Sequence, residues 1–238
     1  MTPAHVSRST RIATGVIKFT LFPGEQRFDY IRRLMDPIES IAVVMTLIGI
    51  VLTIKEKISC WPVAIVGILA YLVVFIRARL YADTALQPIY VVQNIYGWWY
   101  WAHGGMRGHG EAPIVVLEWR SRIAWLAGTA AVSLVVGAAL ARWTNAAAPY
   151  ADAALSTTSL VANWLLARKI LENWWLWIAV NVGYVFLFWK KHLLLSAGLY
   201  AILLALAVAG LIEWQRSIQR QLHAVSEQVP EENHGPAS

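Results

Sequence analysis

Seven long apolar stretches constrain this chain more than any other feature of its sequence. They cover residues 38–54, 61–76, 85–101, 123–141, 153–167, 174–189 and 193–212. Most approach the roughly 20 residues that a tilted helix needs to cross the hydrocarbon core of a bilayer. With 58% hydrophobic and 14% charged residues and a mean hydropathy of +0.52, the chain is too apolar for a water-soluble surface. The sequence predicts an all-α integral membrane protein with seven transmembrane helices.

Two of these seven stretches are interrupted by polar side chains. Gln87, Gln93 and Asn94 interrupt the third, whereas residues 156–159 and Asn163 dilute the fifth. Polar side chains in membrane helices usually face the interior of a bundle, because lipid offers them no hydrogen-bond partner. We therefore expect these two helices to line the protein interior.

An internal repeat appears when the chain is laid over itself, without gaps, in the register that places Trp61 on Trp174. The other matched aromatic residues and glycines in this register are Tyr71 with Tyr184, Phe75 with Phe188, Gly97 with Gly210 and Trp101 with Trp214. The shift passes over four predicted spans, an even number, so both copies enter the membrane in the same direction. The sequence predicts two parallel three-helix repeats joined by a linker helix, with a site between the halves.

The repeat also predicts the boundaries of the chain's parts. These are an N-terminal tail at 1–35, a first repeat at 36–108, a linker helix region at 109–148, a second repeat at 149–216 and a C-terminal tail at 217–238. An alternative is an ancient duplication that survives only for packing, but the halves differ in polarity. Gln87, Asn94 and Trp98 match Tyr200, Ala207 and Leu211, and Asn181 matches Ile68. We expect the two halves to contribute to one asymmetric cavity.

Two helical faces carry the candidate binding residues. They are Trp174, Trp177 and Asn181 in the sixth span, and Gln87, Asn94, Trp98 and Trp101 in the third. Their spacing places each set on one side of its helix. A buried amide needs a hydrogen-bond partner, and indole rings attract cations and stack on flat heterocycles. The two faces therefore predict a site for a planar, cationic ligand.

For several of these residues, helix packing or a place in an interfacial aromatic belt is an alternative to ligand binding. Membrane amides also join helices to one another, for about 0.6 to 2 kcal/mol each. Trp98 and Trp174 lie near span ends, where aromatic belts form. Gly97 would allow either a ligand or a neighbouring helix to approach the backbone.

The distribution of charge narrows the mechanism. Glu39, Asp83, Asp152, Glu172 and Glu213 all fall at or near span ends, whereas an ion relay would place a carboxylate in the middle of the membrane. There is also no glycine-rich phosphate loop for ATP hydrolysis. We therefore expect uncoupled facilitated diffusion. The net charge of +6 is spread over loops on both sides, which favours anionic lipid head groups over nucleic acid as a partner.

Metal and cofactor chemistry has little support in the sequence. A lone cysteine, Cys60, excludes an intrachain disulfide and a cysteine metal cluster. His103, His109 and Glu111 would serve a membrane enzyme acting on a lipid or nucleoside, but their spacing matches no metal motif. A retinal protein is excluded because the seventh span lacks a lysine. We expect no metal and no cofactor; a scaffolding protein is a third alternative, and it would not need two aligned polar faces.

Two runs of residues resemble the signature segments of the PnuC family of bacterial vitamin transporters. One is Gln87 to Trp98, with Asn-Ile-Tyr-Gly-Trp at 94–98, and the other runs from Glu172 through Trp177 to Asn181. The similarity spans nearly all of residues 36–216. It implies a SWEET-like fold in the bacterial inner membrane, assembly as a homotrimer, and a cytoplasmic C-terminus.

The same resemblance implies a vitamin substrate. Nicotinamide riboside is the family's best-known cargo, moved by facilitated diffusion and trapped when a kinase phosphorylates it inside the cell. Other members of the family carry thiamine or riboflavin, so these are alternatives. Gly183 and Tyr184, which follow Asn181, depart from the family pattern, so the exact vitamin is open.

Overall fold

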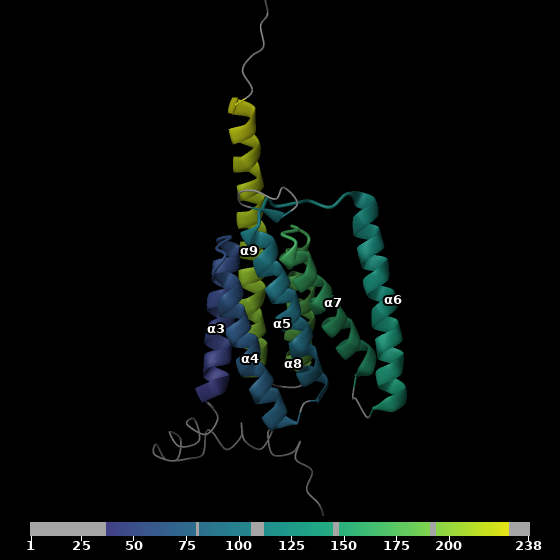
Figure 1. Cartoon of the computed structure of the whole chain (residues 1–238). Helices are drawn as coiled ribbons and strands as arrows, with labels where there is room; N and C mark the ends of the chain where they lie inside the picture. Colours follow the sequence, from purple (N-terminus) through teal and green to yellow (C-terminus); the bar gives the residue numbers. More distant parts are fainter. Residues whose placement is uncertain (1–36, 80, 106–111, 145–147, 191–193, 229–238) are drawn as a thin grey trace, which may run out of the picture.

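The computed structural model describes residues 37–79, 81–105, 112–144, 148–190 and 194–228, and these form seven helices. The helices are α3 (Pro37–Ile54), α4 (Cys60–Ala78), α5 (Tyr81–Ala102), α6 (Trp119–Trp143), α7 (Pro149–Ala167), α8 (Asn173–Lys190) and α9 (Leu194–Gln228) (Figure 1). Each predicted apolar stretch coincides with one helix, which confirms the all-helical prediction. The predicted N-terminal tail lies outside the described residues.

Four of these helices are long and apolar enough to cross a membrane. They are α3, α4, α6 and α9, whose best windows have mean hydropathies between 1.9 and 2.2. The less apolar helices α5, α7 and α8 bury amides, among them Asn94, Asn163 and Asn181. Inward-facing polar groups lower the hydropathy of a helix without exposing those groups to lipid. The weakest windows of the sequence therefore belong to helices that face the interior.

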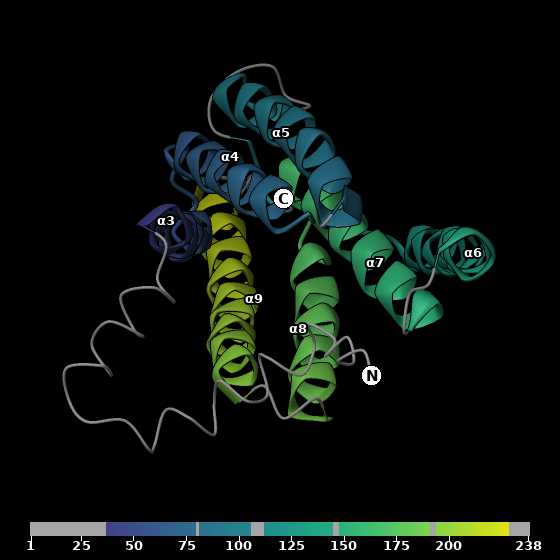
Figure 2. The same cartoon turned by 90° about the horizontal axis from the view of Figure 1, so that it is seen from below.

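Six helices form a closed ring. Neighbouring helices pack in the order α3, α4, α5, α7, α8 and α9, and α9 packs back against α3. Helix α6 lies outside this ring against α7, as the view along the bundle shows (Figure 2). Residues from distant parts of the chain therefore surround one central space.

Glycines at matched positions allow two tryptophan rings to pack against the helix backbone. A Cβ added at Gly97 would overlap the six-membered ring of Trp61, and one at Gly210 would overlap that of Trp174. Gly97 thus serves the close approach of a neighbouring helix rather than of a ligand. The two glycines match each other in the register that pairs the two tryptophans, so the halves make the same contact.

Further pairs repeat the same geometry in both halves. Trp61 and Trp101 pack edge to face at 5.2 Å and 89°, and Trp174 and Trp214 do so at 5.5 Å and 88°. Tyr71 and Phe75 stack at 5.5 Å, and Tyr184 and Phe188 stack at 6.0 Å. Aromatic matches in the sequence therefore correspond to equivalent contacts in space.

The loops before α4 and α8 connect the two halves. Glu56 and Lys169 occupy matched positions and both adopt left-handed backbone conformations, with φ of 55° and 56°. Lys169 Nζ lies 2.7 Å from Glu56 Oε2, and the lysine side chain is only 4% exposed. A buried ion pair therefore joins the α3–α4 loop to the α7–α8 loop.

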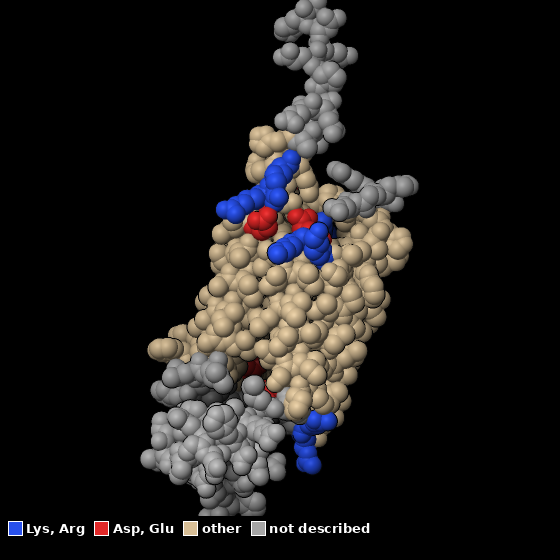
Figure 3. Space-filling view, turned by 90° about the vertical axis from the view of Figure 1, so that its left-hand side faces the viewer, with Lys and Arg blue, Asp and Glu red and all other residues tan. Residues whose placement is uncertain are grey.

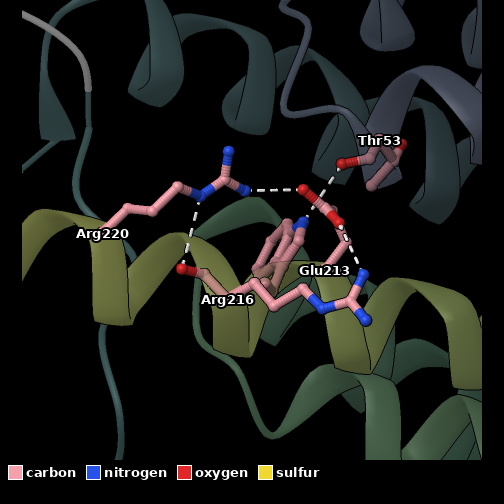
Figure 4. A network of polar contacts seen from close by, with 5 residues as sticks. Thr53, Glu213, Arg216 and Arg220 are labelled. Carbon is pink, nitrogen blue, oxygen red and sulfur yellow. Dashed lines mark hydrogen bonds and ion pairs between the residues drawn. The ribbon is translucent and has the colours of Figure 1, made fainter.

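Helix α9 extends beyond the bundle (Figure 1). Where it leaves the other helices, Trp214 Nε1 donates a hydrogen bond to the Thr53 carbonyl at 3.2 Å. Beside it, Arg220 donates to Glu213 at 2.6 Å, and Arg216 lies 3.8 Å from the same carboxylate (Figure 4). The C-terminal tail expected from residue 217 thus continues as helix to Gln228.

Candidate functional site

A cavity of about 590 Å³ lies inside the ring of six helices. Its walls come from α3, α4, α5, α7, α8 and α9. The volume falls within the range of small-molecule sites, about 300 to 1,000 Å³. Among the described residues that line it there is no lysine, arginine or histidine, whereas Glu39 and Asp83 contribute carboxylates. The cavity is therefore suited to a ligand that carries no negative charge.

Five of the seven residues selected from the sequence line this cavity. Gln87 and Asn94 reach it from α5, and Trp174, Trp177 and Asn181 reach it from α8. The two helices belong to different halves and are far apart in the chain. The structure thus brings the two predicted faces to one space.

Trp98 and Trp101 lie outside the lining, contrary to their inclusion in the predicted site. Trp98 is 42% exposed on the surface of α5, and Trp101 packs between Trp61 and Trp214. The reason is depth, because Trp61 packs over Gly97, about one turn beyond Asn94, and closes the cavity there.

The amides on α5 present hydrogen-bond acceptors to the cavity. Gln87 Nε2 donates to the Asp83 carbonyl at 3.3 Å, and Asn94 Nδ2 donates to the Tyr90 carbonyl at 2.8 Å. Each of these bonds within the helix uses one of the two amide hydrogens and leaves the side-chain oxygen available. Both residues are buried, so a ligand in the cavity is their natural donor.

Asn181 is the most informative polar residue of the cavity. Its side chain is buried, with 6% exposure, and its amide makes no hydrogen bond to any residue in the described part of the chain. The side-chain amide opens onto the cavity, so it is available to hydrogen-bond a ligand there.

Sequence reasoning missed several lining residues, of which Asp83 and Tyr90 matter most. Asp83, Gln87, Tyr90 and Asn94 are spaced i, i+4, i+7 and i+11, and all four line the cavity. The interpretation of Asp83 as a span-end residue overlooked this common face. The helical spacing alone could have revealed it.

A polar link between α5 and α7 lies next to the cavity. Asn163 Nδ2 donates to Gln93 Oε1 at 2.8 Å, and Gln93 Nε2 donates to the Leu160 carbonyl at 3.2 Å. Gln93 therefore joins two helices, whereas Asn163 also lines the cavity. This is the packing function that membrane amides commonly have.

Packed tryptophans cover one end of the cavity. Trp61, Trp101, Trp174 and Trp214 are all buried there, and Lys169 Nζ lies 4.9 Å from the Trp101 ring centre. Lys169 also donates to the Ala112 carbonyl at 2.7 Å, so the segment before α6 is held at this end.

The opposite end of the cavity is acidic. Glu39 and Asp83 lie in the first turns of α3 and α5 and line the cavity there. Acidic atoms are visible within a recess at the lower end of the molecule (Figure 3). The cavity therefore has a tryptophan end and an acidic end, and tyrosines line the cavity between them.

Of the three candidate metal ligands in the loop after α5, only His103 belongs to the described residues. His103 is exposed and its ring nitrogen contacts the Trp99 carbonyl at 2.8 Å, whereas His109 and Glu111 lie outside the described residues. Within the described ranges, no three His, Cys, Asp or Glu side chains are grouped to hold a metal ion.

A ring of apolar helices around a buried aromatic and amide-lined cavity defines a membrane transporter of small molecules. Residues 36–216 match the family model described as nicotinamide mononucleotide transporter, so the chain belongs to this family. It is a multi-pass protein of the bacterial inner membrane. This confirms the resemblance seen in the two signature runs.

Curated relatives carry different vitamins. The nicotinamide riboside transporter PnuC of Escherichia coli (strain K12) is 26% identical over 208 residues, covering 77% of this chain and 87% of the relative. The riboflavin/roseoflavin transporter RibM of Streptomyces davaonensis is also 26% identical, over 193 residues, covering 79% and 88%. A crystal structure of the vitamin B3 transporter PnuC superposes with a TM-score of 0.64 at 24% identity, covering 87% of this chain and 92% of that one. The last similarity supports the fold.

Proposed function

We propose that this protein moves nicotinamide riboside across the inner membrane by facilitated diffusion, with Gln87, Asn94, Trp174, Trp177 and Asn181 as its binding residues. The observation that carries the proposal is the lining of the cavity. Aromatic rings, free amide oxygens and two carboxylates face the same space, and no described basic side chain does. Such a lining favours a flat cation that carries hydroxyl groups.

Nicotinamide riboside has the matching chemistry. Its pyridinium ring is flat and positively charged, which suits the half-buried ring of Trp177. Its ribose hydroxyls would donate to the free oxygens of Gln87 and Asn94, and its carboxamide would pair with Asn181. Trp174 packs against Gly210 and Trp214, so it forms the end wall of the site.

Phosphorylation of the substrate inside the cell would make net transport inward. Once a kinase has phosphorylated the riboside, the product carries a phosphate that Glu39 and Asp83 would repel and that no described lining cation would stabilise. The product therefore stays in the cytoplasm without a pump.

We also propose the finer architecture. The contacts that recur at matched positions support two parallel three-helix repeats of the SWEET-like kind, α3–α5 and α7–α9, joined by α6. The boundaries at 36–108, 109–148 and 149–216 follow from this arrangement. Assembly as a homotrimer is the family expectation, and native mass spectrometry in detergent would test it.

Binding to the purified protein tests the function directly. Isothermal titration calorimetry should detect nicotinamide riboside, and Trp177→Ala or Asn181→Ala should weaken its binding at least tenfold with little loss of thermal stability. Trp175→Ala is the matched control, because Trp175 neighbours the site in sequence, is 56% exposed and does not line the cavity. Unchanged affinity in both cavity variants would contradict the assignment.

Riboflavin is the second candidate, since RibM is as similar in sequence identity as the Escherichia coli transporter. Thiamine, another aromatic cation, is the third. Titrating all three vitamins into the same protein preparation would rank their binding affinities. The carboxylates of the cavity favour the two cations over the neutral flavin, and tighter binding of riboflavin would reverse this order. We propose no enzymatic activity, because the relatives are transporters.

A further inference from the structure

We propose that Asp83 is a specificity-determining residue that selects positively charged substrates, an inference that rests on the proposed function. Its carboxylate lines the acidic end of the cavity, in the first turn of α5. There it would favour a cationic ring over a neutral ring of the same shape.

The position of Asp83 links it directly to the binding residues. Asp83 precedes Gln87 by one helical turn on the same face, and Tyr90 and Asn94 continue this face toward the tryptophan end. A ligand bound to Gln87 therefore lies within about two helical turns of the carboxylate. Charges at such distances interact strongly when protein and lipid replace water.

No charge within the described residues neutralises Asp83. Its carboxylate makes no ion pair with any described residue, and the lining contains no described lysine, arginine or histidine. Glu39 adds a second negative charge to the cavity from α3, and Asp152 lies in the first turn of α7, outside the lining. The described lining therefore carries only negative charge, and the basic side chains near this end, among them Arg77 and Lys190, lie outside it.

The internal repeat shows that packing does not require an acid here. The position matching Asp83 in the second half is Ser196, which also lines the cavity but carries no charge. By contrast, Glu39 matches Asp152, so that pair keeps its acidity in both halves. The carboxylate of Asp83 is therefore a feature of one half only, as are the amides of the site.

An independent observation indicates that this cavity receives a ligand. Asn181 faces the cavity, is more than nine-tenths buried, and has no hydrogen-bond partner in the described part of the chain. Its amide would orient the polar end of a ligand whose charged ring lies in the field of Asp83.

The test compares one ligand in two charge states. Nicotinamide riboside is a cation, and its reduced form, dihydronicotinamide riboside, is neutral and nearly the same in shape. In the full-length protein, Asp83→Asn should weaken binding of the cation about tenfold and change binding of the neutral form less than twofold. Glu118→Gln is the control, because Glu118 is an exposed acid before α6, outside the ring of six helices, and does not line the cavity.

Two further measurements keep the test decisive if Asp83→Asn folds poorly. Asp83→Glu keeps the charge and should keep the preference for the cation. Asp83→Ser, which introduces the uncharged residue found at the matching position of the second half, should lose the preference for the cation. Equal effects on both ligands in these measurements would overturn the proposal.

The outcomes separate this inference from the proposed function. If the wild-type protein binds neither form, the proposed function fails and the inference fails with it. If the wild-type protein binds the cation and Asp83→Asn binds it equally well, the function stands and only the selectivity of Asp83 is overturned.

Discussion

At the scale of single residues, two glycines decide how closely the helices approach. Gly97 and Gly210 lie under the rings of Trp61 and Trp174, where any Cβ would overlap the indole atoms. The requirement is steric, since both glycines lie inside helices. Because the contact occurs twice, the packing of the tryptophan end requires glycine at both positions.

Substitution of Gly97 by alanine should therefore destabilise the protein by about 1 to 3 kcal/mol, the usual cost of overpacking. Thermal unfolding in detergent would measure the loss, and Gly210→Ala should behave alike. Gly128→Ala is the control, because a Cβ there meets no other atom within 4 Å. Equal stability of the Gly97 and Gly128 variants would show that the Trp61 ring moves aside freely.

At the scale of elements, the loops between helices hold the two halves together. Glu56 and Lys169 pair across the halves, and Val115 forms a parallel bridge with Ile170. The Glu172 carboxylate accepts from the Leu117 backbone and pairs with Arg122, although that pair is partly exposed and contributes little. The buried ion pair is the stronger link.

Removal of Lys169 should have a large effect. Lys169→Met leaves Glu56 without its partner and the Ala112 carbonyl without its donor, and such losses cost about 3 to 5 kcal/mol. The melting temperature in detergent is the measurement. Lys190→Met, at the exposed end of α8, should leave it nearly unchanged. A similar melting temperature for both variants would contradict this role.

At the scale of the whole molecule, the described part of the chain begins and ends at opposite ends of the bundle, because α3 starts at one end and α9 finishes beyond the other (Figure 1). The basic residues divide too evenly for the positive-inside rule to choose an orientation. We expect a cytoplasmic C-terminus from the resemblance of the two signature runs to the PnuC family.

Reporter fusions test this orientation. A green fluorescent protein at the C-terminus should be fluorescent, because it folds in the cytoplasm, and alkaline phosphatase at the same position should be inactive. The opposite result would place the acidic end of the cavity, rather than its tryptophan end, toward the cytoplasm.

Most of the fold could be predicted from the sequence, because a bilayer requires long apolar helices and their lengths are readable in one dimension. The register of the internal repeat anticipated the matched contacts of Trp61 and Trp174, since identical packing needs identical side chains at equivalent positions. Helical spacing likewise anticipated the amides of the site, because a polar face in lipid has to turn inward.

Only the tertiary structure decided where the cavity begins and ends. Periodicity gives the direction of a side chain around its helix but not its depth, so it includes Trp98 and Trp101 although the tryptophan packing closes the space before them. Asp83 shares the helical spacing of the site, but its position in the sequence favours interpretation as a span-end residue, although a carboxylate in the first turn of a helix can still face the interior. The sequence determined which faces are polar, and the packing of neighbouring helices determined which of their residues share one cavity.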